Sequence, residues 1–254
     1  MNFKIQPRII PILNLKDNAL IKTKQFQEKI YLGDALNTVR VLNDLDVDEL
    51  IILDIYCSKN KNKLNYPLIE KIASECFMPL TYGGGLKNIE EVKTLFSIGI
   101  EKMSFNSLIF ENFDIFSKVC EKYGAQSVIA SLDVKMQGGT HNIYCNNGTK
   151  KLDFSLKYII EKLNNLGVGE ILITDIEKEG MRCGYNFDLI KEVSSMTNLP
   201  IIINGGADSY DDFKKAFTYG ATGLAASSLF TINKSFETLM INYPDVNEKE
   251  KMFK

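Results

Sequence analysis

The fold follows from one stretch, Val128-Ile129-Ala130-Ser131-Leu132-Asp133-Val134-Lys135, and from its near-copy early in the chain. The stretch is a short run of apolar and β-branched residues, typical of a buried strand, and it delivers a carboxylate near its end. The near-copy is Ile10-Pro11-Ile12-Leu13-Asn14-Leu15-Lys16, in which Leu-Asn-Leu-Lys aligns with Leu-Asp-Val-Lys. The two segments are about 120 residues apart in a chain of 254, which indicates an internal duplication.

Three further pairs of segments repeat in the same order and at nearly the same separation. Leu53-Asp54-Ile55 matches Thr174-Asp175-Ile176, Gly84-Gly85 matches Gly205-Gly206, and Asn106-Ser107 matches Ser227-Ser228. Four ordered matches in one register predict two halves on one plan, about residues 1–123 and 124–243. We expect a single domain over residues 1–243, followed by a charged tail over residues 244–254 that is frayed.

Eight strand-like runs alternate with amphipathic helical segments. The runs are Arg8–Leu13, Glu49–Ile55, Met78–Tyr82, Lys102–Phe105, Ser127–Val134, Glu170–Ile176, Pro200–Asn204 and Gly223–Ser227. They are almost continuously hydrophobic, as strands buried on both faces are. Helix-capping residues open the segments between them, at Asn88, Asn112, Ser155, Asn186 and Ser209. Eight alternations with short connections predict an α/β fold, a closed (β/α)8 TIM barrel built from two duplicated half-barrels.

Two segments interrupt this rhythm after the first and fifth strands. Residues 16–33 are rich in Lys, Gln and Asn and predict a long loop, whereas residues 138–148 predict a small hairpin closing at Asn147-Gly148. Both leave the C-terminal ends of strands, where such barrels place their chemistry, so we expect binding loops or lids.

Composition excludes several classes of protein. No apolar run approaches the roughly 18 residues of a membrane span, and the N-terminus lacks a secretory apolar segment, so we expect a cytoplasmic protein. The net charge of −2 gives no argument for nucleic acid. Five scattered cysteines and the single histidine, His141, argue against a disulfide framework or a zinc site. We therefore expect neither a metal nor a cofactor.

Two glycine turns stand at equivalent places in the two halves. Gly84-Gly85 follows the third strand and Gly205-Gly206 the seventh, where backbone N–H groups can point at an anion. Asn106-Ser107 and Ser227-Ser228 add amide and hydroxyl donors beside them. The alternative is that the glycines only make tight turns. Because the polar partners repeat as well, we favour two phosphate cradles at one mouth, suited to a ligand with a phosphate at each end.

Asp133 and Asn14 should lie between the two cradles. An aspartate at the C-terminal end of a barrel strand is a natural general acid or base, although it can also be a loop-capping carboxylate. Asn14 cannot exchange a proton but can form hydrogen bonds. Lys22, in the first long loop, could reach back over the mouth, or it could be a solvated loop lysine.

Several stretches match one known family. They are Arg8–Pro11, Pro79–Gly85, Ser104–Ser107, Gly169–Thr174, Gly180, Gly184-Tyr185, Gly205–Ala207 and Ala225–Ser228. On these stretches the chain resembles the cyclase subunit of imidazole glycerol phosphate synthase over essentially its full length. In that family the barrel receives ammonia from a glutaminase subunit, then cleaves and cyclises a bisphosphate ribonucleotide. The resemblance implies a lyase-type subunit, a glutaminase partner at the N-terminal face, and a bisphosphate ribonucleotide-like ligand.

The resemblance breaks at the chemical centre. The family pattern has catalytic aspartates at the ends of strands one and five; Asp133 matches the second, but Asn14 stands at the first. Glu179 stands where the family usually has an aspartate, beside Gly180, and the resemblance implies substrate contacts for both. This loss of one acid favours a divergent paralog.

The resemblance also implies an ammonia gate at the opposite face of the barrel. Its residues are Arg8, Glu49, Lys102 and Glu170, which open strands one, two, four and six. Two positive and two negative charges could form a ring across the floor, or they could be four solvated rim charges. We favour the ring because all four match the gate positions of the family.

Three functions stay open at this point. The first is a paralogous subunit that conducts ammonia to an ATP-dependent sugar amidotransferase making acetamidino groups on bacterial surface sugars, with its own cyclase chemistry reduced or lost. The second is a true cyclase of histidine biosynthesis that tolerates Asn14. The third is the sister phosphoribosyl isomerase, ranked last because it has no use for an ammonia gate.

Overall fold

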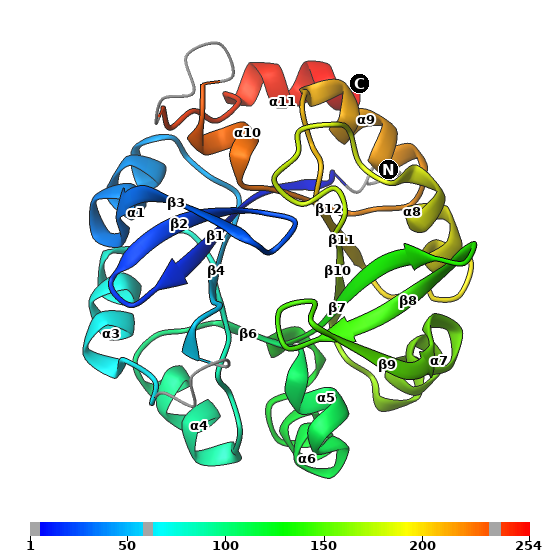
Figure 1. Cartoon of the computed structure of the whole chain (residues 1–254). Helices are drawn as coiled ribbons and strands as arrows, with labels where there is room; N and C mark the ends of the chain where they lie inside the picture. The colour runs from blue at the N-terminus through cyan, green and yellow to red at the C-terminus, as the bar shows by residue number, and fades with distance from the viewer. Residues whose placement is uncertain (1–5, 58–62, 234–239) are drawn as a thin grey trace, which may run out of the picture.

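Eight parallel strands close into a barrel (Figure 1) in the computed structural model, which describes residues 6–57, 63–233 and 240–254. The barrel strands are β1 (Arg8–Lys16), β4 (Leu50–Asp54), β5 (Leu80–Gly83), β6 (Lys102–Phe105), β7 (Val128–Gln137), β10 (Glu170–Asp175), β11 (Ile201–Asn204) and β12 (Gly223–Ala226). Each strand pairs in parallel with the next, and β12 pairs back onto β1. The predicted (β/α)8 barrel is confirmed.

Helices surround the barrel on the outside. They are α1 (Ala35–Asp44), α3 (Tyr66–Glu75), α4 (Ile89–Ser97), α5 (Ser107–Glu111), α6 (Phe113–Tyr123), α7 (Leu156–Leu166), α8 (Phe187–Ser194), α9 (Tyr210–Thr218), α10 (Ser228–Thr231) and α11 (Val246–Phe253), with a 3-10 turn at Ala125–Ser127. The capping residues expected from the sequence open α4, α6, α7, α8 and α9. At α4, Asn88 and Glu91 form a reciprocal capping box, which satisfies backbone N–H groups that the helix itself leaves unpaired.

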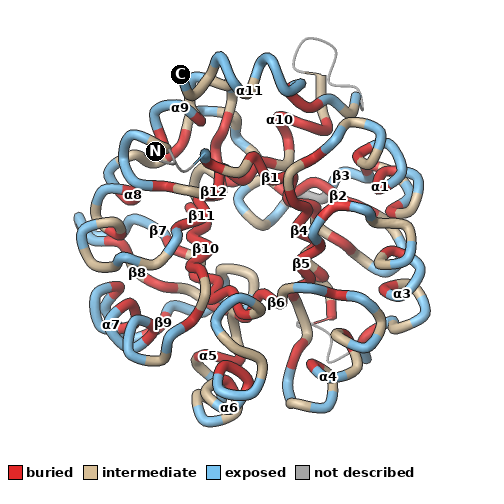
Figure 2. The backbone as a smooth tube through the Cα atoms, turned by 180° about the vertical axis from the view of Figure 1, so that it is seen from behind, coloured by how far each residue is buried: buried red, intermediate tan, exposed pale blue. Residues whose placement is uncertain are grey.

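The core has two layers because the strands are buried on both faces. Apolar residues on the outward face of the strands pack against the helices. A smaller cluster fills the barrel interior, and its members are Ile10, Ile12, Ile51, Ile129, Leu172, Ile202 and Ala225. Figure 2 shows buried residues along the strands and exposed residues on the outer sides of the helices. This double burial explains the nearly continuous hydrophobicity of the strands.

Two antiparallel hairpins stand at the mouth, one after the first strand of each half. The long loop predicted over residues 16–33 is wrong: β2 (Ala19–Lys24) and β3 (Glu28–Asp34) form a hairpin that continues from β1. Leu20 and Leu32 are buried and hold this hairpin against the core. The many lysines of the segment are what made its sequence look like a loop. The second insertion is a hairpin as predicted, made of β8 (Thr140–Cys145) and β9 (Lys150–Ser155), with Asn147-Gly148 in its turn.

The charged C-terminal segment is helical, so the expected fraying is wrong. Asp245 and Glu248 form a capping box at the start of α11, and Lys249 Nζ lies 2.7 Å from Asp48 Oδ1 at the barrel rim. The ring of Phe253 packs edge-on against Phe217 of α9, with centroids 5.7 Å apart. Among the described residues, no helix is both long enough and apolar enough to cross a bilayer.

Candidate active site

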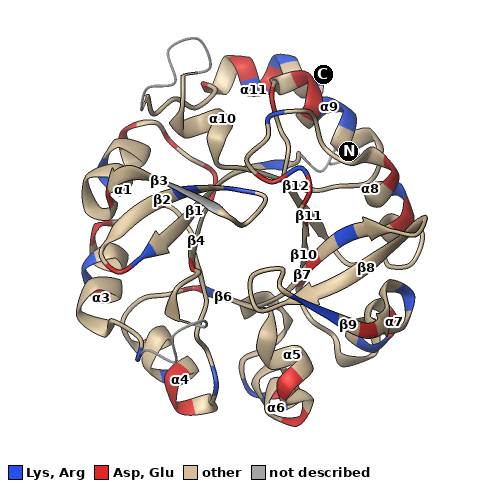
Figure 3. Ribbon diagram, viewed as in Figure 1, with Lys and Arg blue, Asp and Glu red and all other residues tan. Residues whose placement is uncertain are grey.

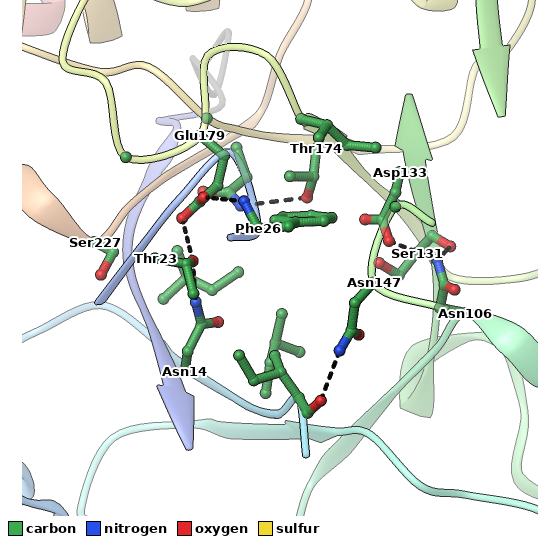
Figure 4. Close-up of a pocket in the computed structure, with 18 of the residues that line it drawn as sticks. Asn14, Thr23, Phe26, Asn106, Ser131, Asp133, Asn147, Thr174, Glu179 and Ser227 are labelled. Carbon is green, nitrogen blue, oxygen red and sulfur yellow. Dashed lines mark hydrogen bonds between the residues drawn. The ribbon is translucent and has the colours of Figure 1, made fainter. Parts of the chain in front are cut away.

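A cavity of about 480 Å³ opens at the C-terminal ends of the barrel strands (Figure 4). Nearly every site residue expected from the sequence lines it. Those residues are Asn14, Gly84, Gly85, Asn106, Ser107, Asp133, Glu179, Gly180, Gly205, Gly206, Ser227 and Ser228. Residues separated by half the chain meet here because parallel barrel strands all end at the same face.

Lys22 does not line this cavity among the described residues. It lies within β2 and is only 7 % exposed, and its positive charge opposes the rise in pKa that burial causes at Glu179. Its role as a ligand-binding lysine stays a prediction, whereas the alternative of a solvated loop lysine is wrong because the side chain is buried. The segment around it is a strand of the first hairpin and not the loop that the sequence suggested.

Asp133, near the C-terminal end of the barrel portion of β7, has an unusual carboxyl group. Burial, and then the negative charge of Glu179, raise its pKa to about 7. The amide of Asn106 donates to Asp133 Oδ2 at 3.2 Å and to the carbonyl oxygen of Ser131 at 3.0 Å. A carboxyl group that titrates near neutral pH can both give and take protons, which is what general acid–base catalysis requires.

Asn14 lies across the cavity from Asp133 and belongs to a hydrogen-bond chain. Asn14 Nδ2 donates to Thr23 Oγ1 at 3.1 Å, and the Thr23 hydroxyl donates to Glu179 Oε1 at 2.8 Å. The backbone N–H of Phe26 donates to Glu179 Oε2 at 3.1 Å, which fixes the tip of the β2–β3 hairpin over the mouth. Burial raises the pKa of Glu179 in spite of the hydrogen bonds that it accepts.

The glycine turns are required by packing. Gly84 has φ +108°, and a Cβ there would lie 2.1 Å from the carbonyl oxygen of Asp54. Its counterpart Gly205 has φ +99°, with the carbonyl oxygen of Asp175 only 2.6 Å from such a Cβ. Close backbone approach thus explains these glycines without a ligand, and the case for phosphate depends on their polar neighbours.

The second cradle carries the clearest sign of a missing partner. The hydroxyl oxygens of Ser227 and Ser228 are buried and find no hydrogen-bond partner in the described part of the chain. A buried hydroxyl without a partner costs about 1–3 kcal/mol, and an oxygen-rich ligand would remove that cost. Arg182, which sequence reasoning missed, lines the same cavity and is held by Asp208 Oδ1 at 2.9 Å. Its position two residues after Gly180 was the available signal.

The opposite face of the barrel holds a ring of four charged side chains. Arg8 pairs with Glu49 at 2.6 Å and also with Glu170, while Lys102 Nζ lies 2.7 Å from Glu170 Oε1 and 3.2 Å from Glu49 Oε1. Burial opposes ionisation of Glu170, but hydrogen bonds and charges from Arg8 and Lys102 outweigh it and lower its pKa. Figure 3 shows other charged residues on the outer helices, the loops and the strands of the mouth hairpins. The four ring residues instead pair with one another from the starts of four different barrel strands.

The chain is similar to proteins of one family over nearly its full length. Residues 8–235 match the family described as histidine biosynthesis protein. A protein of Leptospira borgpetersenii, provisionally named imidazole glycerol phosphate synthase subunit HisF, is 40% identical over 252 residues, which cover 98% of this chain and 99% of the relative.

Two more distant relatives have similar coverage. A Pseudomonas aeruginosa protein, provisionally named subunit hisF2 of the same synthase, is 38% identical over 246 residues, covering 96% of this chain and 98% of its own length. The imidazole glycerol phosphate synthase subunit HisF of Natranaerobius thermophilus is 32% identical over 237 residues, covering 93% and 94%.

Proposed function

This chain belongs to the histidine biosynthesis protein family, and from that premise we propose that it is the cyclase-type barrel subunit of a glutamine amidotransferase. In this proposal a glutaminase partner docks on the N-terminal face and passes ammonia through the barrel to the mouth. The observation that carries the proposal is the ring formed by Arg8, Glu49, Lys102 and Glu170 at the floor, on the axis that leads to the cavity.

The chemistry of ammonia supports a closed passage. Free ammonia is largely protonated near neutral pH and is diluted once it escapes, so delivery needs a passage too dry for ammonium. Apolar residues such as Ile10, Ile51 and Leu172 fill the barrel interior between floor and mouth. Paired charges can close the floor without a large apolar plug because each satisfies its neighbour.

The ligand at the mouth is proposed to be a bisphosphate ribonucleotide or a close relative of one. Support comes from the polar pairs Asn106-Ser107 and Ser227-Ser228, which line one cavity, and from the unpartnered hydroxyls of Ser227 and Ser228. Asp133, with a pKa of about 7, lies between them as the acid–base group.

The finer proposal concerns what the ammonia is used for. With Asn14 in place of an acid, we propose that the family's own cyclisation is slowed, and that the complex supports an ATP-dependent sugar amidotransferase making acetamidino groups on bacterial surface sugars. The second candidate is a true cyclase of histidine biosynthesis. It is favoured by the buried Glu179, which lies one hydroxyl away from Asn14.

The test is Lys102→Ala in the complex with glutaminase. Loss of the lysine leaves two glutamates facing Arg8 alone, so the floor should no longer seal. Glutamine-dependent product formation should fall about tenfold or more, while transfer from added ammonium salt stays near normal. Lys157→Ala, on the outer face of α7, is the matched control and should change neither rate.

Two outcomes would contradict the gate: equal loss with both nitrogen sources, or no loss with either. The ammonium arm also separates the two candidates. Turnover of the bisphosphate ribonucleotide by the unmodified barrel at an ordinary enzyme's rate, on the order of 1–10³ s⁻¹, indicates the true cyclase. Much slower turnover supports the paralog.

A further inference from the structure

Glu179 is a second buried carboxyl group in the wall of the cavity, on the side away from Asp133. It follows β10, is 6 % exposed and lines the same cavity. Figure 4 shows Glu179 and Asn14 on one wall and Asp133 on the other. A single hydroxyl, that of Thr23, separates the Asn14 amide from the Glu179 carboxylate. The wall that lacks an acid at position 14 therefore has one beside it.

The direction of the hydrogen bonds explains why an amide at position 14 fits a carboxylate at position 179. Thr23 has one hydroxyl hydrogen, which it donates to Glu179 Oε1, so Thr23 Oγ1 can only accept from its other neighbour. The Asn14 amide supplies that donor. A carboxylate at position 14 could not donate, and two carboxylates would then compete for one hydroxyl while repelling each other.

We propose that Glu179 supplies the carboxyl group that position 14 lacks and acts with Asp133 as the acid–base pair of the barrel mouth. The inference rests on the proposed function and deepens it by assigning its proton transfers. In each turnover one carboxylate takes a proton from the ligand and the other, protonated carboxyl gives one back. The ligand's proton count is unchanged, and exchange with water resets the pair.

The electrostatics of the cavity agree with a working pair. Burial raises the pKa of both groups, and the negative charge of Glu179 further raises that of Asp133. An ionised Glu179 therefore favours the protonated form of Asp133, which is the condition for one acid and one base. Glu177 also lines the cavity, but its carboxylate accepts the backbone N–H of Met136 at 3.1 Å.

The first experiment compares Glu179→Gln with Glu177→Gln in ammonium-dependent turnover of the bisphosphate ribonucleotide. Both changes remove a carboxylate from one loop, and both carboxylates hold a hairpin backbone N–H, so hairpin fixation is matched. Turnover of Glu179→Gln should fall about 10²-fold, with calorimetric affinity for the bisphosphate unchanged, and this loss should be at least about tenfold larger than that of Glu177→Gln.

The double variant Asn14→Asp with Glu179→Gln moves the carboxyl group to the other end of the hydrogen-bond chain through Thr23. Its turnover should be about tenfold faster than that of Glu179→Gln alone. Two results overturn the proposal. One is a Glu179→Gln protein as fast as Glu177→Gln, and the other is a loss that the double variant does not reverse.

The second experiment does not depend on the reaction. The pKa of Asp133 is measured by carbon-detected NMR titration, with the signal assigned by its disappearance in Asp133→Asn. From about 7 in the unmodified protein, this pKa should fall in Glu179→Gln and remain the same in Glu177→Gln. An unmoved pKa overturns the pairing. A barrel that neither binds the bisphosphate nor turns it over refutes the proposed function instead, and the titration still decides on the pair.

Discussion

The floor and the mouth of this barrel use polar side chains in opposite ways. At the floor, Arg8, Glu49, Lys102 and Glu170 satisfy one another, and Glu49 is only 2 % exposed. At the mouth, buried hydroxyls lack partners in the described structure and a buried carboxyl titrates near neutrality. A buried polar group whose partners lie within the protein is compatible with a stable fold. A buried polar group without such a partner destabilises the fold and is available to bind a ligand or react.

The largest expected effect comes from breaking the floor. Glu49→Gln leaves the partly buried Arg8 and Lys102 facing one glutamate, so part of their positive charge loses its compensation. We expect the free energy of unfolding to fall by about 3 kcal/mol, measured by urea denaturation. The control is Glu75→Gln, which breaks the exposed Arg40–Glu75 pair and should change the free energy of unfolding far less, because water screens that pair. Equal effects would mean that the floor charges are ordinary surface pairs.

At the mouth, removing a carboxylate should raise the free energy of unfolding, whereas at the floor it lowers it. Because the pKa of Asp133 rises from 3.8 to about 7 on folding, the folded state holds a proton that the unfolded chain has released. Stability is therefore lost as pH rises from about 4 to about 7. Asp133→Asn removes this loss while abolishing turnover. We expect a gain of about 1–2 kcal/mol at pH 8, below the full shift because the cavity admits water, and no gain near pH 4. A variant less stable than the parent at pH 8 would contradict this assignment.

The smallest expected effect is at Ser228. Ser228→Ala removes a buried hydroxyl without a partner, so the free protein should gain up to about 1 kcal/mol in stability. Affinity for inorganic phosphate or for the bisphosphate ligand should nevertheless fall about tenfold, measured by calorimetry. Thr231→Val is the contrast, because Thr231 Oγ1 donates to the carbonyl oxygen of Ser227 at 3.0 Å. Removing this satisfied hydroxyl should lower the stability of the protein. Unchanged phosphate affinity in Ser228→Ala would remove this residue from the cradle.

The sequence by itself determined the barrel and most of the cavity wall. Strands such as Lys102–Phe105 were predicted at their observed bounds because strands that are buried on both faces have nearly continuous apolar sequences. Parallel strands begin at one face and end at the other, so naming strand starts and ends placed Arg8 and Lys102 at the floor and Asn14 and Asp133 at the mouth. The duplication then brought both halves to the same cavity.

Only the tertiary structure decided which groups touch. The first hairpin, in which Lys22 is buried, was missed because the burial of Leu20 and Leu32 depends on helices and strands elsewhere in the chain. The link from Thr23 to Glu179 joins residues 156 positions apart, and no local pattern encodes such a contact. Periodicity records whether a side chain is buried, since burial repeats along one element. It does not record which partner a buried polar group meets, because that partner comes from another element and is fixed only when the barrel closes.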